Sequence, residues 1–376
     1  MKPLLKKMTT PEPTPFARFV SALVAGASWL SVLSLWLCAA SVYVNPSHFK
    51  WLGVLGLAFP LFLAGTVAML FVSLLFAPRR SWIPLLGLLA CFGSIRTYVP
   101  FNPFRSAITP NDGDLRVVSY NTHFFNHAND RTFDGISQYL RDLHADVICF
   151  QEGPRDEENN AKIHAQFADT RTPHYDYYDA GGAALGLISA YPLLRRETIS
   201  LFEGNGVVAY WLQLPEGDTL LVLNSHLRSN LLTPDERKEY STLIHDREAR
   251  QEDVVVQTST RLASKIAGSS HIRAAMADTM ATFLAQHTEL PTIVCGDFNE
   301  TPISYSRYRM VRSGLTDAYR TAANGIGRSF NRDAIWVRID HTFCSSHFEV
   351  LNSRIDHEAQ YSDHYPIIST FRRKRP

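Results

Sequence analysis

Cysteine is scarce in this chain, and its spacing excludes several kinds of site. Five cysteines occur among 376 residues, and no two have the spacing of a metal or redox motif. Cys38 and Cys91 fall in apolar runs, while Cys149 and Cys295 fall in patterns of buried strands, where cysteine behaves as a small hydrophobic residue. Cys344 stands alone. The sequence therefore predicts no disulfide framework.

Net charge is also almost absent, at +1 for the whole chain. Residues 1–114 hold nine of the 37 Lys and Arg and three of the 36 Asp and Glu, so residues 115–376 carry a net charge of −5. Proteins that grip nucleic acid without reading its sequence do so through basic surfaces. The acidic balance therefore disfavours a polyanionic partner for the C-terminal part, although it does not exclude a local basic groove.

Charged residues are missing from two long stretches near the N-terminus. None occurs from Phe19 to Val44 or from Trp51 to Ala77, and each run exceeds the ~20 residues that a helix needs to cross a bilayer. A third apolar run, from Trp82 to Val99, is shorter and contains Arg96. A cleaved signal peptide is the alternative for the first run, but that run is too long and a second follows closely. We therefore predict a transmembrane region at 19–100, with about three spans at 19–44, 51–77 and 82–99.

Basic residues around these runs predict an orientation. Four precede the first run, Arg79 and Arg80 separate the second from the third, and Lys50 alone lies between the first two. By the positive-inside rule the tail at 1–18 is cytoplasmic, and three spans then place the C-terminal domain outside. The sequence predicts a multi-pass protein of the cell membrane with an extracytoplasmic domain. The spans contain almost no polar residues for a pathway, which argues against a transporter or channel.

Residues 101–114 contain proline, asparagine and glycine, which predict a linker before a domain at 115–376. In that domain strands alternate with helices. Strands are predicted at 116–120, 147–150, 185–189, 207–214, 219–224 and 367–371, and a helix at 133–143. An α/β pattern with polar groups at strand ends is typical of ligand-binding domains.

The stretch at 234–289 differs, because it is rich in charged residues and helix formers. Ile272, Met276, Met280 and Leu284 recur at one-turn spacing. This stripe predicts a helix that packs against the sheet. The alternative is a lid over a site, or a segment that rests against the membrane.

The most informative stretch runs from Ile293 to Pro302. An apolar run breaks at Gly296, and Asp297 and Asn299 follow two positions apart, so that in extended chain both side chains point the same way. A carboxylate beside a carboxamide suits work on a phosphate ester. The acid holds a proton or binds a hard cation, and the amide donates to an oxygen that gains negative charge. The alternative is a strand that ends in a turn, since these residue types also form turns.

Polar groups follow other strand-like or loop segments in the same way. They are Asn121 after Val117–Tyr120, Glu152 after Ile148–Gln151, His226 after Val222–Ser225, and the segment Ser362-Asp363-His364-Tyr365-Pro366. A purely structural account does not require these groups. One such end is weak evidence, but the recurrence indicates a shared site.

Together these motifs resemble those of the endonuclease/exonuclease/phosphatase superfamily, which includes DNase I-like nucleases, neutral sphingomyelinases and inositol polyphosphate phosphatases. In chain order they are Ser119-Tyr120-Asn121, Gln151-Glu152, Asn224-Ser225-His226-Leu227, Gly296-Asp297-Phe298-Asn299, Arg338-Ile339-Asp340-His341 and Ser362-Asp363-His364. The resemblance covers about 115–376. The three apolar segments ahead of this domain are also similar to a membrane-anchored bacterial branch of the family.

The resemblance implies a fold and a cofactor. The fold is a four-layer α/β sandwich of the DNase I-like kind, with the site at one end of two facing sheets. The activity is hydrolysis of a phosphoester with a divalent metal, usually Mg²⁺, with Mn²⁺ as the alternative. Glu152, with Asn121 beside it, offers oxygen ligands to such a hard cation. Asp363 would bind the metal or orient the network.

The resemblance also implies catalytic roles. His364 is the expected base for the attacking water, and Asp340 would hold its tautomer and stabilise the imidazolium. Asp297 would orient the water or protonate the leaving group, and the sequence does not choose between these roles. Asn299 and His226 would donate to the non-bridging phosphate oxygens. For His226 the alternative is a buried histidine with a structural role.

Some positions depart from the family pattern or stay ambiguous. His123 stands where several nucleases of the family have an acidic residue, so a second metal ligand there is in doubt. His341 stands where an aromatic residue is frequent. Arg228, Arg155 and Arg328 are candidates to pair with a phosphate, although a solvated surface charge is the simpler interpretation of each.

The sequence as a whole predicts a membrane-anchored, metal-dependent phosphoesterase. The acidic balance and the membrane tether favour a phospholipid head group or a small phosphoester over nucleic acid. A DNase I-like nuclease is the first alternative. A non-catalytic, membrane-tethered binding protein of this fold is the second, but loss of Glu152, Asp297 or His364 would mark it and all three are present.

Overall fold

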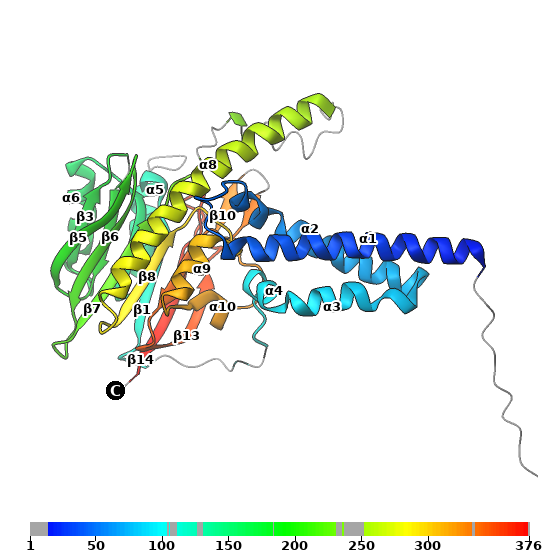
Figure 1. Ribbon diagram of the computed structural model, residues 1–376. Helices are drawn as coiled ribbons and strands as arrows, with labels where there is room; N and C mark the ends of the chain where they lie inside the picture. Colours follow the sequence, from blue (N-terminus) through cyan, green and yellow to red (C-terminus); the bar gives the residue numbers. More distant parts are fainter. Residues whose placement is uncertain are drawn as a thin grey trace, which may run out of the picture. The chain divides into compact units, whose positions relative to one another are not determined.

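The computed structural model describes residues 14–103, 105, 111–125, 131–182, 184–230, 235–236, 252–332 and 335–374. The chain divides into two compact units, one formed by Met1–Ala39 and Ala58–Ile95, the other by Ala40–Leu57 and Arg96–Pro376. The elements are labelled in Figure 1. Much of the predicted tail at 1–18, part of the linker at 101–114 and most of 231–251 lie outside the described residues.

The first unit is helical. Helices α1 (Pro15–Ala40) and α2 (Leu52–Phe76) are long and apolar enough to cross a membrane. The hydroxyls of Ser28 and Ser73 lie 3.2 Å apart, so a hydrogen bond joins the two helices. Many large apolar side chains of both helices are exposed. This distinguishes them from the buried core helix of a soluble domain.

The third predicted span is not confirmed as one continuous helix. It is divided at Cys91 into α3 (Trp82–Ala90) and α4 (Phe92–Tyr98). The nine residues of α3 extend only about 14 Å at 1.5 Å per residue, against a hydrocarbon core of about 30 Å. Within the described ranges, two helices meet the criteria of length and composition. The short 3₁₀ turns η1 (Ser41–Tyr43) and η2 (Pro78–Arg80) lie between the helices.

The second unit contains two mixed six-stranded sheets. The first, in spatial order, is β13 (Phe348–Ile355), β14 (Ile367–Arg373), β1 (Leu115–Asn121), β2 (Val147–Gly153), β4 (Ala184–Ser189) and β3 (His174–Asp179). The second is β5 (Leu193–Phe202), β6 (Asn205–Gln213), β7 (Thr219–His226), β8 (Thr292–Asp297), β12 (Asp340–Cys344) and β9 (Thr316–Asp317). A hairpin of β10 (Phe330–Arg332) and β11 (Ile335–Val337) forms a separate two-stranded sheet.

Three apolar clusters stack the unit into four layers, as predicted. One lies between the sheets and contains Val117 and Cys149 of the first sheet with Val222 and Cys295 of the second. Helices α5 (Arg131–Asp142) and α6 (Glu157–Phe167) cover the outer face of the first sheet. Helices α8 (Glu252–Ala285) and α9 (Tyr305–Arg312) cover the outer face of the second, as Figure 1 shows for α8. The predicted α/β sandwich is therefore confirmed.

The predicted strands are present, and several of them, including β2 and β7, are longer than expected. β2 continues through Gln151 and Glu152, and β7 continues to His226. Glu152 and His226 therefore lie within the ends of strands, whose positions the sheet determines. The stripe of Met276, Met280 and Leu284 packs on the second sheet, which confirms the simpler interpretation of that helix.

Two segments outside the sheets are tied to this unit. Asn45, between α1 and α2, donates from Nδ2 to Asp278 of α8 at 2.7 Å and to the Tyr305 hydroxyl of α9 at 3.2 Å. Asn102, in the predicted linker, donates to the carbonyls of Arg320 and Ala323. The first of these lies in α10 (Ala318–Ala322). The described part of the linker is therefore bonded to the domain and is not a free tether.

Candidate active site

The register of the strands brings the predicted site residues together. In the second sheet, Asp297 pairs with His226 of the parallel strand β7 on one side and with Asp340 of the antiparallel strand β12 on the other. In the first sheet, Asn121 pairs with Gln151, so Glu152 is the next residue along. Residues separated by up to 71 positions in the sequence thus become neighbours in a sheet.

The backbone around Asp297 requires special residues. Gly296 has a φ of +142°, and a Cβ at this position would lie 1.8 Å from the Ser225 carbonyl oxygen, so only glycine fits. Glu152 and Asn299 have φ values of 49° and 52°. Non-glycine residues in this region cost roughly 1–3 kcal/mol each and gather at functional sites.

Asn121 joins the two sheets at the site. Its Nδ2 donates to Glu152 Oε1 at 3.1 Å and to Asp297 Oδ2 at 3.1 Å. Its carbonyl oxygen accepts from the Ser362 hydroxyl at 2.8 Å, which holds the segment that carries His364. One buried amide therefore positions an acid from each sheet.

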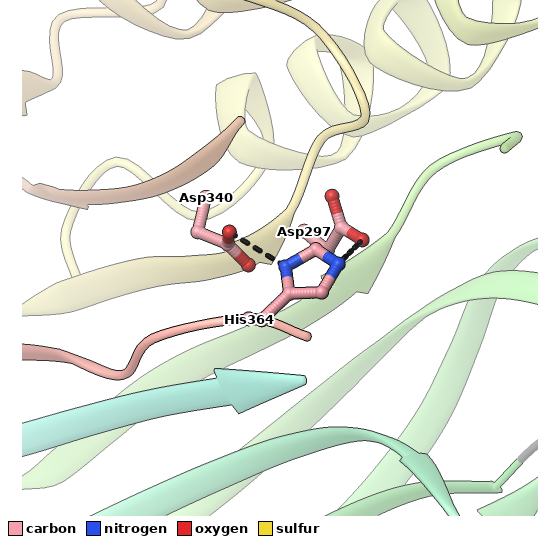
Figure 2. A group of neighbouring side chains, drawn as sticks. All are labelled: Asp297, Asp340 and His364. Atoms are coloured by element: carbon pink, nitrogen blue, oxygen red, sulfur yellow. Dashed lines mark hydrogen bonds and ion pairs between the residues drawn. The ribbon is translucent and has the colours of Figure 1, made fainter. Parts of the chain in front are cut away.

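His364 lies between two buried carboxylates, as Figure 2 shows. Its Nδ1 is hydrogen-bonded to Asp340 Oδ2 at 2.9 Å, and its Nε2 is 3.7 Å from Asp297 Oδ2. Burial disfavours the imidazolium, but the two carboxylates outweigh burial and raise the pKa of His364 to about 10. This ring is therefore placed to hold a proton at Nε2, with Asp340 fixing the proton on Nδ1.

At Asp297 burial prevails over the groups that favour the charged form, whereas at His364 those groups prevail over burial. Burial and the neighbouring Asp340 raise the pKa of its carboxyl to about 6, although His364, His226 and the backbone N–H of Asn299 favour the ionised form. That N–H donates to Asp297 Oδ1 at 2.8 Å. A carboxyl poised near neutrality suits proton transfer.

His226 and Asn299 offer N–H donors beside these acids. His226 Nε2 is buried, has no hydrogen-bond partner among the described residues, and lies 3.6 Å from Glu152 Oε1 and 3.8 Å from Asp297 Oδ2. The Asn299 amide donates to the Leu227 carbonyl at 3.1 Å and keeps a second N–H. A buried donor without a partner is costly in a purely structural residue, which favours the functional interpretation of His226.

Asp363 lies beside this group. Its carboxylate accepts from the Ser362 hydroxyl at 3.4 Å and lies 3.7 Å from Arg332 Nε of the hairpin. Phe330 of the same hairpin packs edge-on against the His364 ring. The hairpin therefore borders the site, and sequence reasoning did not single it out.

Other supporting residues were also missed. Gln151 donates to Asn224 Oδ1 at 2.7 Å, and the Asn224 amide donates to the carbonyls of Phe150 and Gly186, so these side chains tie the two sheets together beneath the site. Both had appeared only as parts of motifs. Their burial between strands could not be seen in a one-dimensional pattern.

The expectation of a solvated Arg228 is wrong. This side chain is buried, ion-paired to Glu203 at 2.6 Å and set over the Phe202 ring. Its carbonyl accepts from Arg273 of α8. Arg155 is exposed, as the sequence suggested, and Arg328 packs over the Tyr365 ring.

The residues present fit a divalent cation. Asn121 and Glu152 offer amide and carboxylate oxygens, and Asp297, Asp340 and His364 have ligand atoms within 4.8 Å of one another. Asp340 Oδ1 is buried without a hydrogen-bond partner in the described part of the chain. Because oxygen ligands with excess negative charge are what hard cations prefer, either group could hold one. The hydrogen bond between His364 and Asp340 occupies a ring nitrogen that a metal ligand would need. Asn121 and Glu152 are therefore the favoured ligands of the cation.

Sequence comparison finds a family match for each part of the chain. The profile of the Endonuclease/Exonuclease/phosphatase family matches residues 118–364, and a domain of unknown function matches residues 21–98. No curated protein matches the sequence. The first match spans all the motifs from Asn121 to His364.

Solved structures are similar to this chain at low sequence identity. A functionally unknown conserved protein from Enterococcus faecalis V583 is 14% identical, with a TM-score of 0.50 over 69% of this chain and 100% of its own. An endonuclease/exonuclease/phosphatase from Beutenbergia cavernae is 15% identical, with a TM-score of 0.49 over 69% of this chain and 72% of its own. A mannosyl-6-phosphatase from Bacteroides thetaiotaomicron is 17% identical, with a TM-score of 0.45 over 69% and 99%.

Proposed function

Because the chain belongs to the endonuclease/exonuclease/phosphatase family, we propose that it is a membrane-anchored phosphoesterase that depends on a divalent metal. One observation carries this proposal. His364, bonded to Asp340, faces Asp297 next to the Asn121 and Glu152 pair. This arrangement offers a base, an acid and metal ligands within one buried cluster.

In the proposed mechanism, His364 Nε2 takes a proton from the attacking water. The cation held by the site would lower the pKa of this ring from about 10, so that Nε2 is unprotonated and able to accept. Asp340 accepts the Nδ1–H and stabilises the imidazolium that forms. Asp297, with its raised pKa, holds a proton for the leaving oxygen or orients the water. His226 Nε2 and the second N–H of Asn299 donate to the non-bridging oxygens of the phosphate.

Asn121 and Glu152 would hold the metal, with Asp363 as a further ligand. A bound Mg²⁺ or Mn²⁺ would polarise the phosphate, offset charge on the leaving oxygen and lower the pKa values of neighbouring groups. The φ of 49° at Glu152 lies in the left-handed region, where non-glycine residues gather at functional sites. The bond from Asn121 Nδ2 leaves the other Glu152 oxygen free to ligate.

The proposed substrate is a phospholipid head group or a small phosphoester. The domain at 115–376 carries a net charge of −5, and a nuclease is expected to present a basic face to its substrate. The exposed apolar faces of α1 and α2 support insertion in a membrane. Insertion would place the domain beside lipid.

The proposed orientation is extracytoplasmic. Residues 40–57 and the domain belong to one unit, joined through Asn45, Asp278 and Tyr305. If α2 crosses the membrane away from residues 40–57, residues 77–98 must cross back. The chain then re-enters the domain on the side where residues 40–57 lie. The basic pair Arg79 and Arg80 then marks the cytoplasmic turn.

The test is hydrolysis by the purified full chain, with Mg²⁺ and with chelator. The substrates are plasmid DNA, sphingomyelin, phosphatidylcholine and a small phosphodiester. We expect metal-dependent turnover of one lipid or small phosphoester, and a loss of about 10²–10⁴-fold in kcat for His364→Ala and Glu152→Gln. Exposed residues supply the matched controls, His271→Ala and Glu158→Gln, which should keep wild-type rates.

The same assay separates the alternatives. Turnover of DNA alone would replace the lipid assignment with the nuclease alternative. Binding of a ligand equally by wild type and both site variants, with no turnover of any substrate, would favour the non-catalytic binding protein.

A further inference from the structure

A second cluster of charge lies outside the candidate active site. A pocket of about 490 Å³ is lined by Arg96, Arg105, Arg320, Phe101, Asn102 and Thr321, with Pro103 at its edge. All of these residues belong to the second unit. The volume falls in the range of roughly 300–1,000 Å³ typical of small-molecule sites. Three guanidinium groups therefore share one pocket, and no carboxylate is among its described lining residues.

The guanidinium groups of the three arginines donate hydrogen bonds to neutral acceptors. Arg96 donates to Asn102 Oδ1 at 2.7 Å, Arg105 to the Thr321 and Val350 carbonyls, and Arg320 to the Thr97 hydroxyl at 3.1 Å. The Nε atoms of Arg96 and Arg105 are buried and have no hydrogen-bond partner among the described residues. Their positive charge and two of their donors are therefore unsatisfied.

The surroundings add positive charge. Burial lowers the pKa of Arg320, and the nearby Arg307 and Arg96 lower it further, while Asp317 opposes them. The neighbouring carboxylate, Asp317, is bonded to Arg307 at 2.8 Å. Arg338, over the Tyr319 ring, also acts on this acid. One buried carboxylate, Asp317, is thus shared by Arg307, Arg320 and Arg338. The arginines keep an excess of positive charge, which would stabilise an arriving anion.

The pocket also adjoins apolar chain. Arg96 is in α4, near the end of the third apolar run, and Phe101 is 69% exposed at the pocket. Basic pockets next to apolar helices are suited to lipid head groups, because the acyl chains and the phosphate are satisfied together. Arginine is the preferred partner of phosphate, since its planar fork donates two parallel hydrogen bonds.

We propose that this arginine pocket binds the phosphate group of an anionic phospholipid and so holds the domain against the membrane surface. The lipid identity of the phosphate rests on the proposed membrane anchoring, whereas the anion site rests on the arginines alone. The ligand here is bound and not hydrolysed, because the pocket contains none of the acids or histidines of the candidate active site.

The test measures binding by the full chain in neutral detergent with chelator present. The probes are dihexanoyl phosphatidylglycerol, dihexanoyl phosphatidylcholine and inorganic phosphate. We expect phosphatidylglycerol to bind at least about tenfold more tightly than the other two, and the Arg105→Gln/Arg320→Gln variant to lose about tenfold or more. Arg141→Gln removes a half-buried arginine that also donates to neutral acceptors, and it should bind as wild type does.

Other outcomes would overturn the proposal. They are equal binding of the two lipids, equal binding by wild type and the double variant, or inorganic phosphate binding as tightly as phosphatidylglycerol, which would make free phosphate the ligand. Turnover of a soluble phosphodiester by the double variant should stay within about twofold of wild type, which separates this site from the catalytic one.

A second variant guards against a folding defect. Arg96 donates to a side chain and not to the backbone, so Arg96→Gln should keep the thermal unfolding midpoint of wild type. We expect it to weaken phosphatidylglycerol binding about threefold or more. A folded Arg96→Gln protein that binds as wild type does would also refute the pocket.

Discussion

Because Gly296 has no side chain, the backbone next to Asp297 can adopt its unusual conformation. A Cβ there would lie 1.8 Å from the Ser225 carbonyl oxygen, with φ at +142°. We therefore expect Gly296→Ala to lower the free energy of unfolding by about 3 kcal/mol or more, because backbone must move.

The matched control is Gly268→Ala on α8, where a Cβ meets nothing within 4 Å. That change should stabilise by about 0.5–1 kcal/mol, and denaturant unfolding measures both. Similar stability of the two variants would contradict the strained backbone.

His341 makes a prediction about pH. Its ring is buried against Phe298 and Phe343, and its Nε2 donates to the Glu300 carbonyl at 3.0 Å. Burial lowers its pKa from 6.5 to about 4. The folded state therefore holds this histidine neutral, while the unfolded chain takes up a proton below pH 6.5. Its contribution to stability is present above pH 6.5 and is lost as the pH falls towards 4.

We expect the free energy of unfolding of wild type to fall by about 1–2 kcal/mol more between pH 7.5 and pH 5 than that of His341→Phe, which has no such proton to bind. Urea unfolding at the two pH values measures this difference. His271→Ala, which removes an exposed histidine, should follow wild type. Parallel pH dependence of wild type and His341→Phe would exclude the buried neutral histidine.

At the scale of elements, α8 is fixed to the loop after β8 by a buried ion pair. Arg273 Nε lies 3.0 Å from Glu300 Oε1, and both side chains are over 90% buried. The Ser270 hydroxyl donates to the same oxygen at 2.6 Å. Because Glu300 directly follows Asn299, this pair connects the long helix to a candidate catalytic residue.

Removing one partner leaves a buried charge unpaired. We expect Arg273→Met to destabilise by about 3–5 kcal/mol, and the double variant Arg273→Met/Glu300→Gln to recover more than half of that loss. Thermal and denaturant unfolding of wild type, Arg273→Met, Glu300→Gln and the double variant measure the cycle. As a control, Arg171→Met breaks the ion pair between Arg171 and Asp146. The Arg171 side chain is 62% exposed, so this change should lower the free energy of unfolding far less. A double variant no more stable than Arg273→Met would show that lost packing is responsible.

At the scale of the whole molecule, the order of the segments predicts a topology. The chain should remain in the membrane fraction after carbonate extraction, because α1 and α2 expose apolar side chains along their length. A C-terminal alkaline phosphatase fusion should be active and a C-terminal green fluorescent protein fusion dark. The control is a truncated chain fused after Arg80, which should give the reverse pattern. A fluorescent C-terminal fusion of the full chain would refute the extracytoplasmic domain.

The sequence by itself determined the class of fold, the position of the apolar region and the identity of the motif residues. It could do so because these features are local. Alternating apolar strands, runs without charge, and short motifs such as Gly296-Asp297-Phe298-Asn299 are each readable within about ten neighbouring residues.

Only the tertiary structure decided which of these residues meet. Parallel pairing of β7 with β8 sets His226 beside Asp297, and one buried amide, Asn121, joins the two sheets. The burial of Arg228, the break at Cys91 and the arginine pocket were likewise hidden. The physical reason is that strand register and burial depend on contacts between residues far apart in the chain. A local sequence pattern shows only the spacing of apolar and polar residues within one segment.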